Sequence, residues 1–261
     1  MADHPGQTFA LTDLVRALKL SRATCHALLT GLVEVGYLYR TSDKSYVLGP
    51  GLAKICHAVA EHFSPLQVAQ PEMRTLADEF DVVCTAFFLE DNAIHVRERA
   101  ASLSHVGVSV PLGTRIRLRP SSAPIFYAWS PREEVERWVK SYRATPEQRD
   151  MLDKGISFVR QHGFAILIDD VASPSHAAAE VDINQAPVQP ITDLKPRQSY
   201  PVTSLLAPVF DAEGKVAFAM GLHGFDRSMS GSEAGEIASR LRAACDRITG
   251  YIGGHRRPVP A

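Results

Sequence analysis

The stretch Leu20–Leu38, LSRATCHALLTGLVEVGYL, contains a helix start, an amphipathic run and a helix stop. Gly36 stands where a helix C-cap glycine belongs, and we predict a helix over Ser21–Val35. Its apolar residues recur at the spacing of one helix face and should pack inward. That stripe consists of Cys25, Leu28, Leu29, Leu32 and Val33.

A second row of the same helix is polar and consists of Arg22, His26 and Thr30. Neighbouring residues on a helix point ~100° apart, so Cys25 and His26 face different ways and should not form a catalytic pair. Small residues beside the polar row let a partner approach the backbone, and Arg and hydroxyl groups can donate to phosphates or base edges. The alternative is a solvated helix in a domain that binds protein.

The segments on either side of this helix complete a known structural motif. A short helix over Leu11–Leu18, with Thr12 as a plausible cap, precedes it, and YLYRTSDKSYVL (37–48) reads as two strands around a polar turn. Helix, turn, helix and hairpin match a winged helix-turn-helix, whose second helix enters the DNA major groove. The predicted DNA contacts are Ser21, Arg22, Thr24, His26, Thr30, and Arg40 and Lys44 on the wing.

The composition is that of a globular chain of 261 residues, with 45% apolar and 22% charged residues and a net charge of −1. Nucleic-acid contact must therefore come from a local patch. The four cysteines lie far apart, so we predict buried free thiols in a reducing cytosol and no metal site or cofactor. With no signal peptide and no apolar run of ~18 residues, we expect a cytoplasmic protein without membrane contact.

The periodicity divides the chain into four parts: residues 1–50 (winged domain), 51–64 (linker helix), 65–254 (second domain) and 255–261 (flexible tail). The second domain reads as a mixed α+β unit with helices flanking a mainly antiparallel sheet. We predict strands at 82–90, 93–100, 105–113, 164–169, 202–210 and 215–225, and helices at 72–80, 121–129, 132–142, 145–163 and 231–253. Residues 171–201, with five prolines, should form a long loop that is either a lid or partly disordered.

The segment FALTDLVRALKLSRATCHALLTGLVEVGYLYRTSDKSYVLGPGLAKI (9–55) resembles the DNA-binding domain of the isocitrate lyase regulator (IclR) family of bacterial transcription factors. SSAPIFYAWSPREE (121–134) and LLAPVFDAEGKVAFAMGLHGF (205–225) are similar to that family's GAF-like effector-binding domain. The resemblance implies a homodimer or dimer of dimers on operator DNA, with a small organic acid or aromatic metabolite as effector. We expect a repressor rather than an activator.

Four features depart from the family pattern. Only MADHPGQT (1–8) precedes the winged segment, so the family's first helix is apparently missing and part of the Leu28/Leu32 stripe should lack a cover. We interpret this as a true start further upstream or as a domain with weakened DNA binding. Ala23 and Ala27 replace a family Ser and Arg, Ala123-Pro124 replaces a Gly-Lys pair, and the loop 171–201 is longer.

The resemblance also places an effector site over the sheet, at Ser121, Ser122, Ala123, Asp169, Ser204, Gly221 and His223. A helix start with Ser hydroxyls and free backbone N–H groups would favour an anion. Gly221 and His223 alternate with Met220 and Leu222 and should share one face, and Gly221 in place of a family serine should widen the pocket. The alternatives are that Ser121 and Ser122 only cap the helix and that His223 is an ordinary core residue.

Two other functions are alternatives to a DNA-binding regulator. An enzyme on the second domain has little support, because no nucleophile motif, phosphate loop or metal cluster occurs and His95, His105, His176 and His223 have no visible partners. No catalytic residue is therefore predicted. A sensor or protein-interaction module with weakened DNA binding is the stronger alternative, because of the missing first helix.

Overall fold

The computed structural model describes residues 1, 7–55, 64–105, 110–169 and 188–256. The chain divides into two compact units, residues 1–64 (unit 1) and 65–261 (unit 2). The finer predicted bounds, 1–50 and 51–64, stay predictions; residues 51–55 are helical and 56–63 lie outside the described residues.

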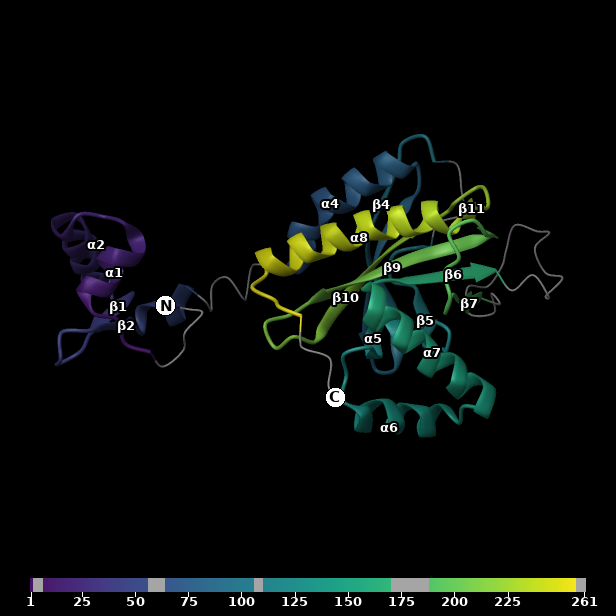
Figure 1. Cartoon of the computed structure of the whole chain (residues 1–261), viewed down its shortest axis with the longest axis horizontal. Coiled ribbons are helices and arrows are strands. Elements are labelled where there is room, and N and C mark those ends of the chain that lie inside the picture. The colour runs from purple at the N-terminus through teal and green to yellow at the C-terminus, as the bar shows by residue number, and fades with distance from the viewer. Residues whose placement is uncertain (2–6, 56–63, 106–109, 170–187, 257–261) are drawn as a thin grey trace. The chain divides into compact units, whose positions relative to one another are not determined.

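Unit 1 is a helix pair followed by a hairpin (Figure 1). It contains α1 (Leu11–Leu18), α2 (Arg22–Glu34), β1 (Leu38–Arg40) and β2 (Tyr46–Leu48). The core of the described part is small and consists of Leu14, Cys25, Leu29, Leu38 and Tyr46. The predicted winged helix-turn-helix is confirmed, although Ala10 rather than Thr12 is the N-cap residue of α1.

The apolar stripe of α2 is only partly covered. Cys25 and Leu29 are buried, whereas Leu28 and Leu32 are 53% and 39% exposed, as predicted. Val35, one further turn along, is exposed as well. These three side chains follow one another at i, i+4 and i+7 on one face of α2, and an exposed apolar surface of this kind marks an interaction site or an aggregation hazard.

Unit 2 is built around a seven-stranded sheet in the order β5-β4-β3-β10-β9-β6-β7, with every neighbouring pair antiparallel. The strands are β3 (Val83–Glu90), β4 (Ala93–Ala101), β5 (Arg115–Arg117), β6 (Ala165–Asp169), β7 (Val188–Pro190), β9 (Val202–Phe210) and β10 (Val216–His223). A separate pair joins β8 (Ser199–Tyr200) to β11 (Met229–Ser230). The α+β prediction with a mainly antiparallel sheet is confirmed.

Helices cover both faces of this sheet (Figure 1). One face carries α4 (Pro65–Phe80) and α8 (Gly231–Tyr251) over a core that includes Phe218, Met220 and Leu222. The other carries α5 (Pro124–Tyr127), α6 (Arg132–Tyr142) and α7 (Pro146–His162). None of the helices in the described ranges is long and apolar enough to cross a membrane.

Four local predictions were wrong. Residues 110–114 are not a strand, because Pro111 and Gly113 (φ +81°) make a turn before β5, and 106–109 lie outside the described residues. The helix predicted over 121–129 is only α5, four residues long. The predicted loop 171–201 contains β7 and β8, which pair through the backbone at sheet edges; 170–187 lie outside the described residues.

The fourth concerns the tail. His255 donates its backbone N–H to Asp211 O at 3.2 Å, and the Arg256 guanidinium lies 4.7 Å from the centre of the Trp129 ring. These two residues are thus part of the fold of unit 2, whereas 257–261 are outside the described residues.

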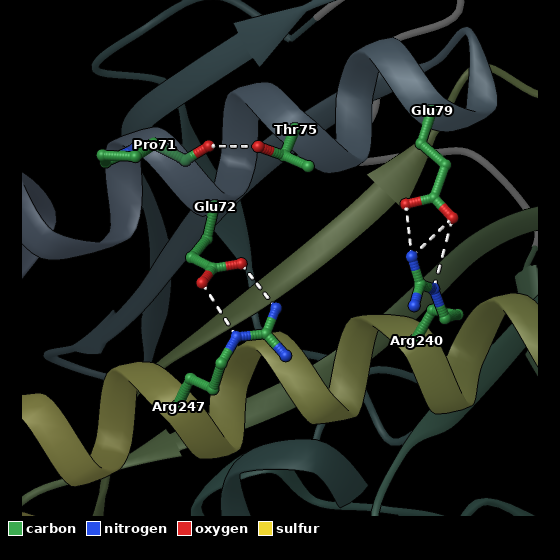
Figure 2. Close-up of polar contacts among 6 residues, drawn as sticks. All are labelled: Pro71, Glu72, Thr75, Glu79, Arg240 and Arg247. Atoms are coloured by element: carbon green, nitrogen blue, oxygen red, sulfur yellow. Dashed lines mark hydrogen bonds and ion pairs between the residues drawn. The ribbon is translucent and has the colours of Figure 1, made fainter.

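Two arginines of α8 reach two glutamates of α4 (Figure 2). Arg247 donates from Nε and Nη2 to the two carboxylate oxygens of Glu72, at 2.9 and 2.7 Å. Arg240 contacts both oxygens of Glu79 at 2.9 and 3.0 Å. The seven-residue spacing on each helix places both ion pairs on one face, so the two helices are tied together at two points two turns apart.

We predict that Arg247→Ala lowers the free energy of unfolding of unit 2 by about 0.5–1 kcal/mol at neutral pH, because a bidentate pair on a half-exposed surface contributes that much. Arg247 lowers the pKa of Glu72 below its ordinary 4.5, so the stabilisation is present above that pKa and lost as the pH falls through the folded-state pKa. Urea unfolding followed by tryptophan fluorescence measures it, since both tryptophans lie in unit 2.

The matched control is Lys154→Ala, which removes an exposed pair with Asp150 on one helix. Its effect should be about 0.3 kcal/mol. A loss for Arg247→Ala that persists unchanged once the pH lies below the folded-state pKa of Glu72 would contradict the ion-pair explanation.

Candidate DNA-binding and effector sites

The start of α2 is fixed by its own side chains. Ser21 Oγ accepts from the backbone N–H of Thr24 at 3.1 Å and lies 2.7 Å from Thr24 Oγ1. Thr30 Oγ1 donates to His26 O at 2.9 Å. Three of the predicted hydroxyl contacts, Ser21, Thr24 and Thr30, are therefore engaged locally. Thr30 uses its hydroxyl hydrogen within the helix, and one of the two hydroxyl hydrogens of Ser21 and Thr24 is used between them.

The His26 ring and the Arg22 guanidinium of α2 point away from the core of unit 1. Arg22 and His26 are exposed, while Cys25 is fully buried, so the predicted separation of Cys25 from His26 is confirmed. Cys84 and Cys245 are also buried free thiols, and burial raises the pKa of both. Within the described ranges, no group of three or more His, Cys, Asp or Glu side chains could hold a metal ion.

The wing places the two predicted cations close to an acid. Arg40 lies on β1, 5.8 Å from the centre of the Tyr46 ring, and Lys44 occupies the turn with φ +65°. Between them Thr41 Oγ1 donates to Asp43 Oδ1, and this hydrogen bond is the main cause of the lowered pKa of Asp43. Asp43 thus stays ionised and offsets part of the positive charge at the wing.

In unit 2 the sheet register brings three predicted effector residues together. Ser204 on β9 and His223 on β10 are direct Cα partners, and Gly221 lies two residues from His223 on the same face. Asp169 ends β6, two residues after Leu167, which is the Cα partner of Ser204. By strand alternation all four residues lie on the face that α5 and α7 cover.

The start of α5 does not offer the expected anion site. The N–H groups of Ser122 and Ala123 both donate to Arg119 O, at 3.0 and 2.8 Å, and the next residue is Pro124, which has no N–H. Ser121 and Ala123 are buried, and Ser122 is half-buried with its hydroxyl on the Arg119 backbone. The prediction of free backbone donors at this position was therefore wrong.

The expectation that Gly221 widens a pocket was also wrong. A Cβ on Gly221 would lie 2.7 Å from Leu206 Cδ2 and 2.7 Å from Phe87 Cε2. Neighbouring apolar side chains already occupy the space that the missing side chain leaves. Gly221 therefore contributes to close packing of the sheet surface and not to a cavity.

Two residues that the sequence analysis did not single out surround His223. Thr85 Oγ1 lies 3.3 Å from His223 Nε2, and the Phe87 and His223 rings are 6.3 Å apart. Thr85 is the one polar side chain in the apolar run Val82–Leu89, a signal that could have identified it. His105, set aside as unpartnered, has its Nδ1 3.2 Å from Asp81 O.

A separate open groove of about 1730 Å³ lies on unit 2. It is bordered by the end of α4, the first turns of α8 and the segment after β10, and His105, Gly224 and Arg240 are among its lining residues. None of the seven predicted effector residues lines it.

Comparison with known proteins agrees with both units. Residues 1–42 match the model of the IclR helix-turn-helix domain. The HTH-type transcriptional regulator KipR of Bacillus subtilis (strain 168) is 22% identical over 248 residues, 94% of this chain and 90% of KipR. KipR is by name a transcriptional regulator.

Solved structures show the same fold. Pseudomonas aeruginosa HmgR has a TM-score of 0.68 at 21% identity, over 96% of this chain and 92% of HmgR. The Agobacterium tumefaciens repressor BlcR has a TM-score of 0.64 at 15% identity, over 95% and 90%. Together with the helix-turn-helix match and the full-length relative, they support an IclR-family transcriptional regulator: the chain has the fold of such regulators, and residues 1–42 are its IclR-type DNA-binding domain.

Proposed function

We propose that the protein is a cytoplasmic, ligand-responsive repressor that binds operator DNA as a homodimer or dimer of dimers. The observation that carries the proposal is the exposed polar row at the start of α2, which follows α1 through a tight turn and precedes a basic wing. BlcR, a repressor of similar fold, supports the sign of regulation.

DNA contact would come from Arg22 and His26 in the major groove and from Arg40 and Lys44 on the backbone. Ser21, Thr24 and Thr30 would complete the surface as acceptors or water-mediated contacts. Residues 1–64 contain six Lys/Arg and five Asp/Glu, a net charge of about +1. So small a charge makes avidity from two or more copies necessary, and phosphate contacts should make binding depend steeply on salt.

The effector would be a small organic acid or an aromatic metabolite on the α5-covered face of the sheet. Ser204, Gly221 and His223 form the part that the register brings together, and Ser121, Ser122, Ala123 and Asp169 are proposed around it. Binding there would shift the population between DNA-competent and DNA-incompetent forms.

Arg22→Ala should weaken binding to the operator by about 1–3 kcal/mol, or roughly 5- to 150-fold, if Arg22 reads a base. Fluorescence anisotropy on the protein's own upstream region, over a range of salt concentrations, measures this. Arg132→Ala, an exposed arginine of α6, is the matched control and should have no effect.

Equal losses on operator and random DNA would assign Arg22 to a phosphate instead of a base. A flat salt dependence of wild-type binding would contradict the proposed DNA contact altogether.

A protein-interaction module with weakened DNA binding is the second candidate. The exposed Leu28, Leu32 and Val35 favour it, because an apolar helix face suits a protein partner better than a phosphate backbone. Absence of any shift of the upstream DNA at low salt would favour this candidate over the first.

A further inference from the structure

The segment that follows α8 runs back along the end of strand β9. Its backbone lies so close to that strand that a Cβ on Gly254 would be 1.9 Å from Phe210 O. The next residue, His255, donates its backbone N–H to Asp211 O at 3.2 Å. We call residues 254–256 the strap. It connects the end of α8, on one face of the sheet, to residues at the edge of the other face.

Arg256 makes the contacts of the strap with that other face. Its guanidinium carbon lies 4.7 Å from the centre of the Trp129 ring, which belongs to the core beneath α5, α6 and α7. Its Nη2 donates to Arg160 O at 3.2 Å. Arg160 lies in the last turn of α7, where carbonyl oxygens have no partner inside the helix and carry partial negative charge. Both contacts favour a cation at this position.

Two features oppose the same contacts. Partial burial of the guanidinium and, as a smaller cause, the charge of Arg242 both lower the pKa of Arg256, while Asp246 offsets part of the effect. Arg242 donates from Nη1 to His162 O at 2.8 Å, so two arginines lie at the end of α7. Arg256 is largely exposed, and at such a site a ring contact and one hydrogen bond each contribute only modestly. The favourable and opposing interactions of the closed strap are therefore of similar size.

We propose that the strap is a releasable connection between α8 and the helices on the opposite face of the sheet, closed by Arg256 and opposed by Arg242. In the open form Arg256 leaves Trp129 and Arg160 O, and the His255 N–H leaves Asp211 O. Gly253, with φ +72° and no atom within 4 Å of an added Cβ, is the hinge.

The consequence for unit 2 is a two-state contact between helices that the sheet otherwise separates. Because its two forms differ little in free energy, any partner or ligand that favours one of them shifts the population. The proposal depends on neither DNA binding nor an effector.

Amide hydrogen exchange on the full chain, followed by NMR, tests the strap. When opening and closing are faster than exchange, the rate at the His255 amide measures the open fraction. Arg256→Ala should raise that rate by about 3- to 10-fold. The Ile252 amide donates to Ile248 O at 3.0 Å at the end of α8 and should keep its wild-type rate. Arg132→Ala, which removes an exposed arginine of α6, is the matched control and should change neither rate.

Arg242→Gln tests the opposition between the two arginines. Glutamine keeps an N–H group that can donate to His162 O but removes the positive charge beside Arg256. The His255 amide should therefore exchange about 2-fold more slowly, because closing no longer brings two cations together. A purely structural brace of two arginines would be weakened by either substitution.

Faster His255 exchange in Arg242→Gln would thus overturn the proposal. An unchanged His255 rate in Arg256→Ala would overturn it as well. So would equal acceleration at Ile252 and His255, because that result would mean that the end of α8 frays as a whole.

Discussion

Leu222→Ala should lower the free energy of unfolding of unit 2 by about 2–5 kcal/mol. Leu222 is fully buried on β10, the central strand of the seven, and packs in the core beneath α4 and α8. Truncation removes buried methyl groups and leaves a cavity that a sheet hydrogen-bonded on both sides cannot close. Urea unfolding followed by the fluorescence of Trp129 and Trp138 measures the loss.

Leu103→Ala is the matched control, because it makes the same chemical change at a side chain that is 98% exposed. Its effect should stay within about 0.5 kcal/mol. Comparable losses for the two variants would mean that the core beneath α4 and α8 is not packed as described.

Leu29→Ala should abolish operator binding, because it unfolds unit 1. Leu29 is 4% exposed and belongs to a described core of five buried residues. A domain of this size rarely has more than about 3–5 kcal/mol of stability, and the truncation costs about 2–4 kcal/mol. Anisotropy titration should show a loss of at least about 100-fold, while tryptophan fluorescence reports an unchanged unit 2.

Leu28→Ala is the control, because it makes the same change at the adjacent residue of α2. It shows whether any leucine-to-alanine change in this helix weakens operator binding. Its side chain is 53% exposed, so the fold of unit 1 should survive, as measured by the chemical shifts of its amide groups. Wild-type operator affinity in Leu29→Ala would refute the assignment of Leu29 to the core that holds the helix pair.

The sequence predicted unit 1 well because its signals are local. Ser21 caps α2, Gly36 ends it with φ +76°, and the 3.6-residue period separates the buried Cys25 from the exposed His26. The expectation that part of the Leu28/Leu32 stripe lacks a cover is confirmed as well, since both side chains are exposed.

The candidate effector site was predictable only in part. Strand alternation placed Gly221 and His223 on one face, and the register made Ser204 the partner of His223. The sequence could not show that the backbone N–H groups of Ser122 and Ala123 donate to Arg119 O. Nor could it show that Leu206 and Phe87 fill the space over Gly221. Those facts depend on contacts between residues far apart in the chain or on the exact course of one turn.

The sequence by itself thus determined the elements that short-range periodicity, capping and turn residues encode: the helix-turn-helix, the hairpin wing and most strands of the sheet. Only the tertiary structure decided which polar atoms remain unpaired once those elements pack. Thr85 and His223 are 138 residues apart and meet because β3 and β10 are neighbours in the sheet. Local patterns fix how a segment folds, but a hydrogen bond between strands depends on register, which the packing of the whole domain sets.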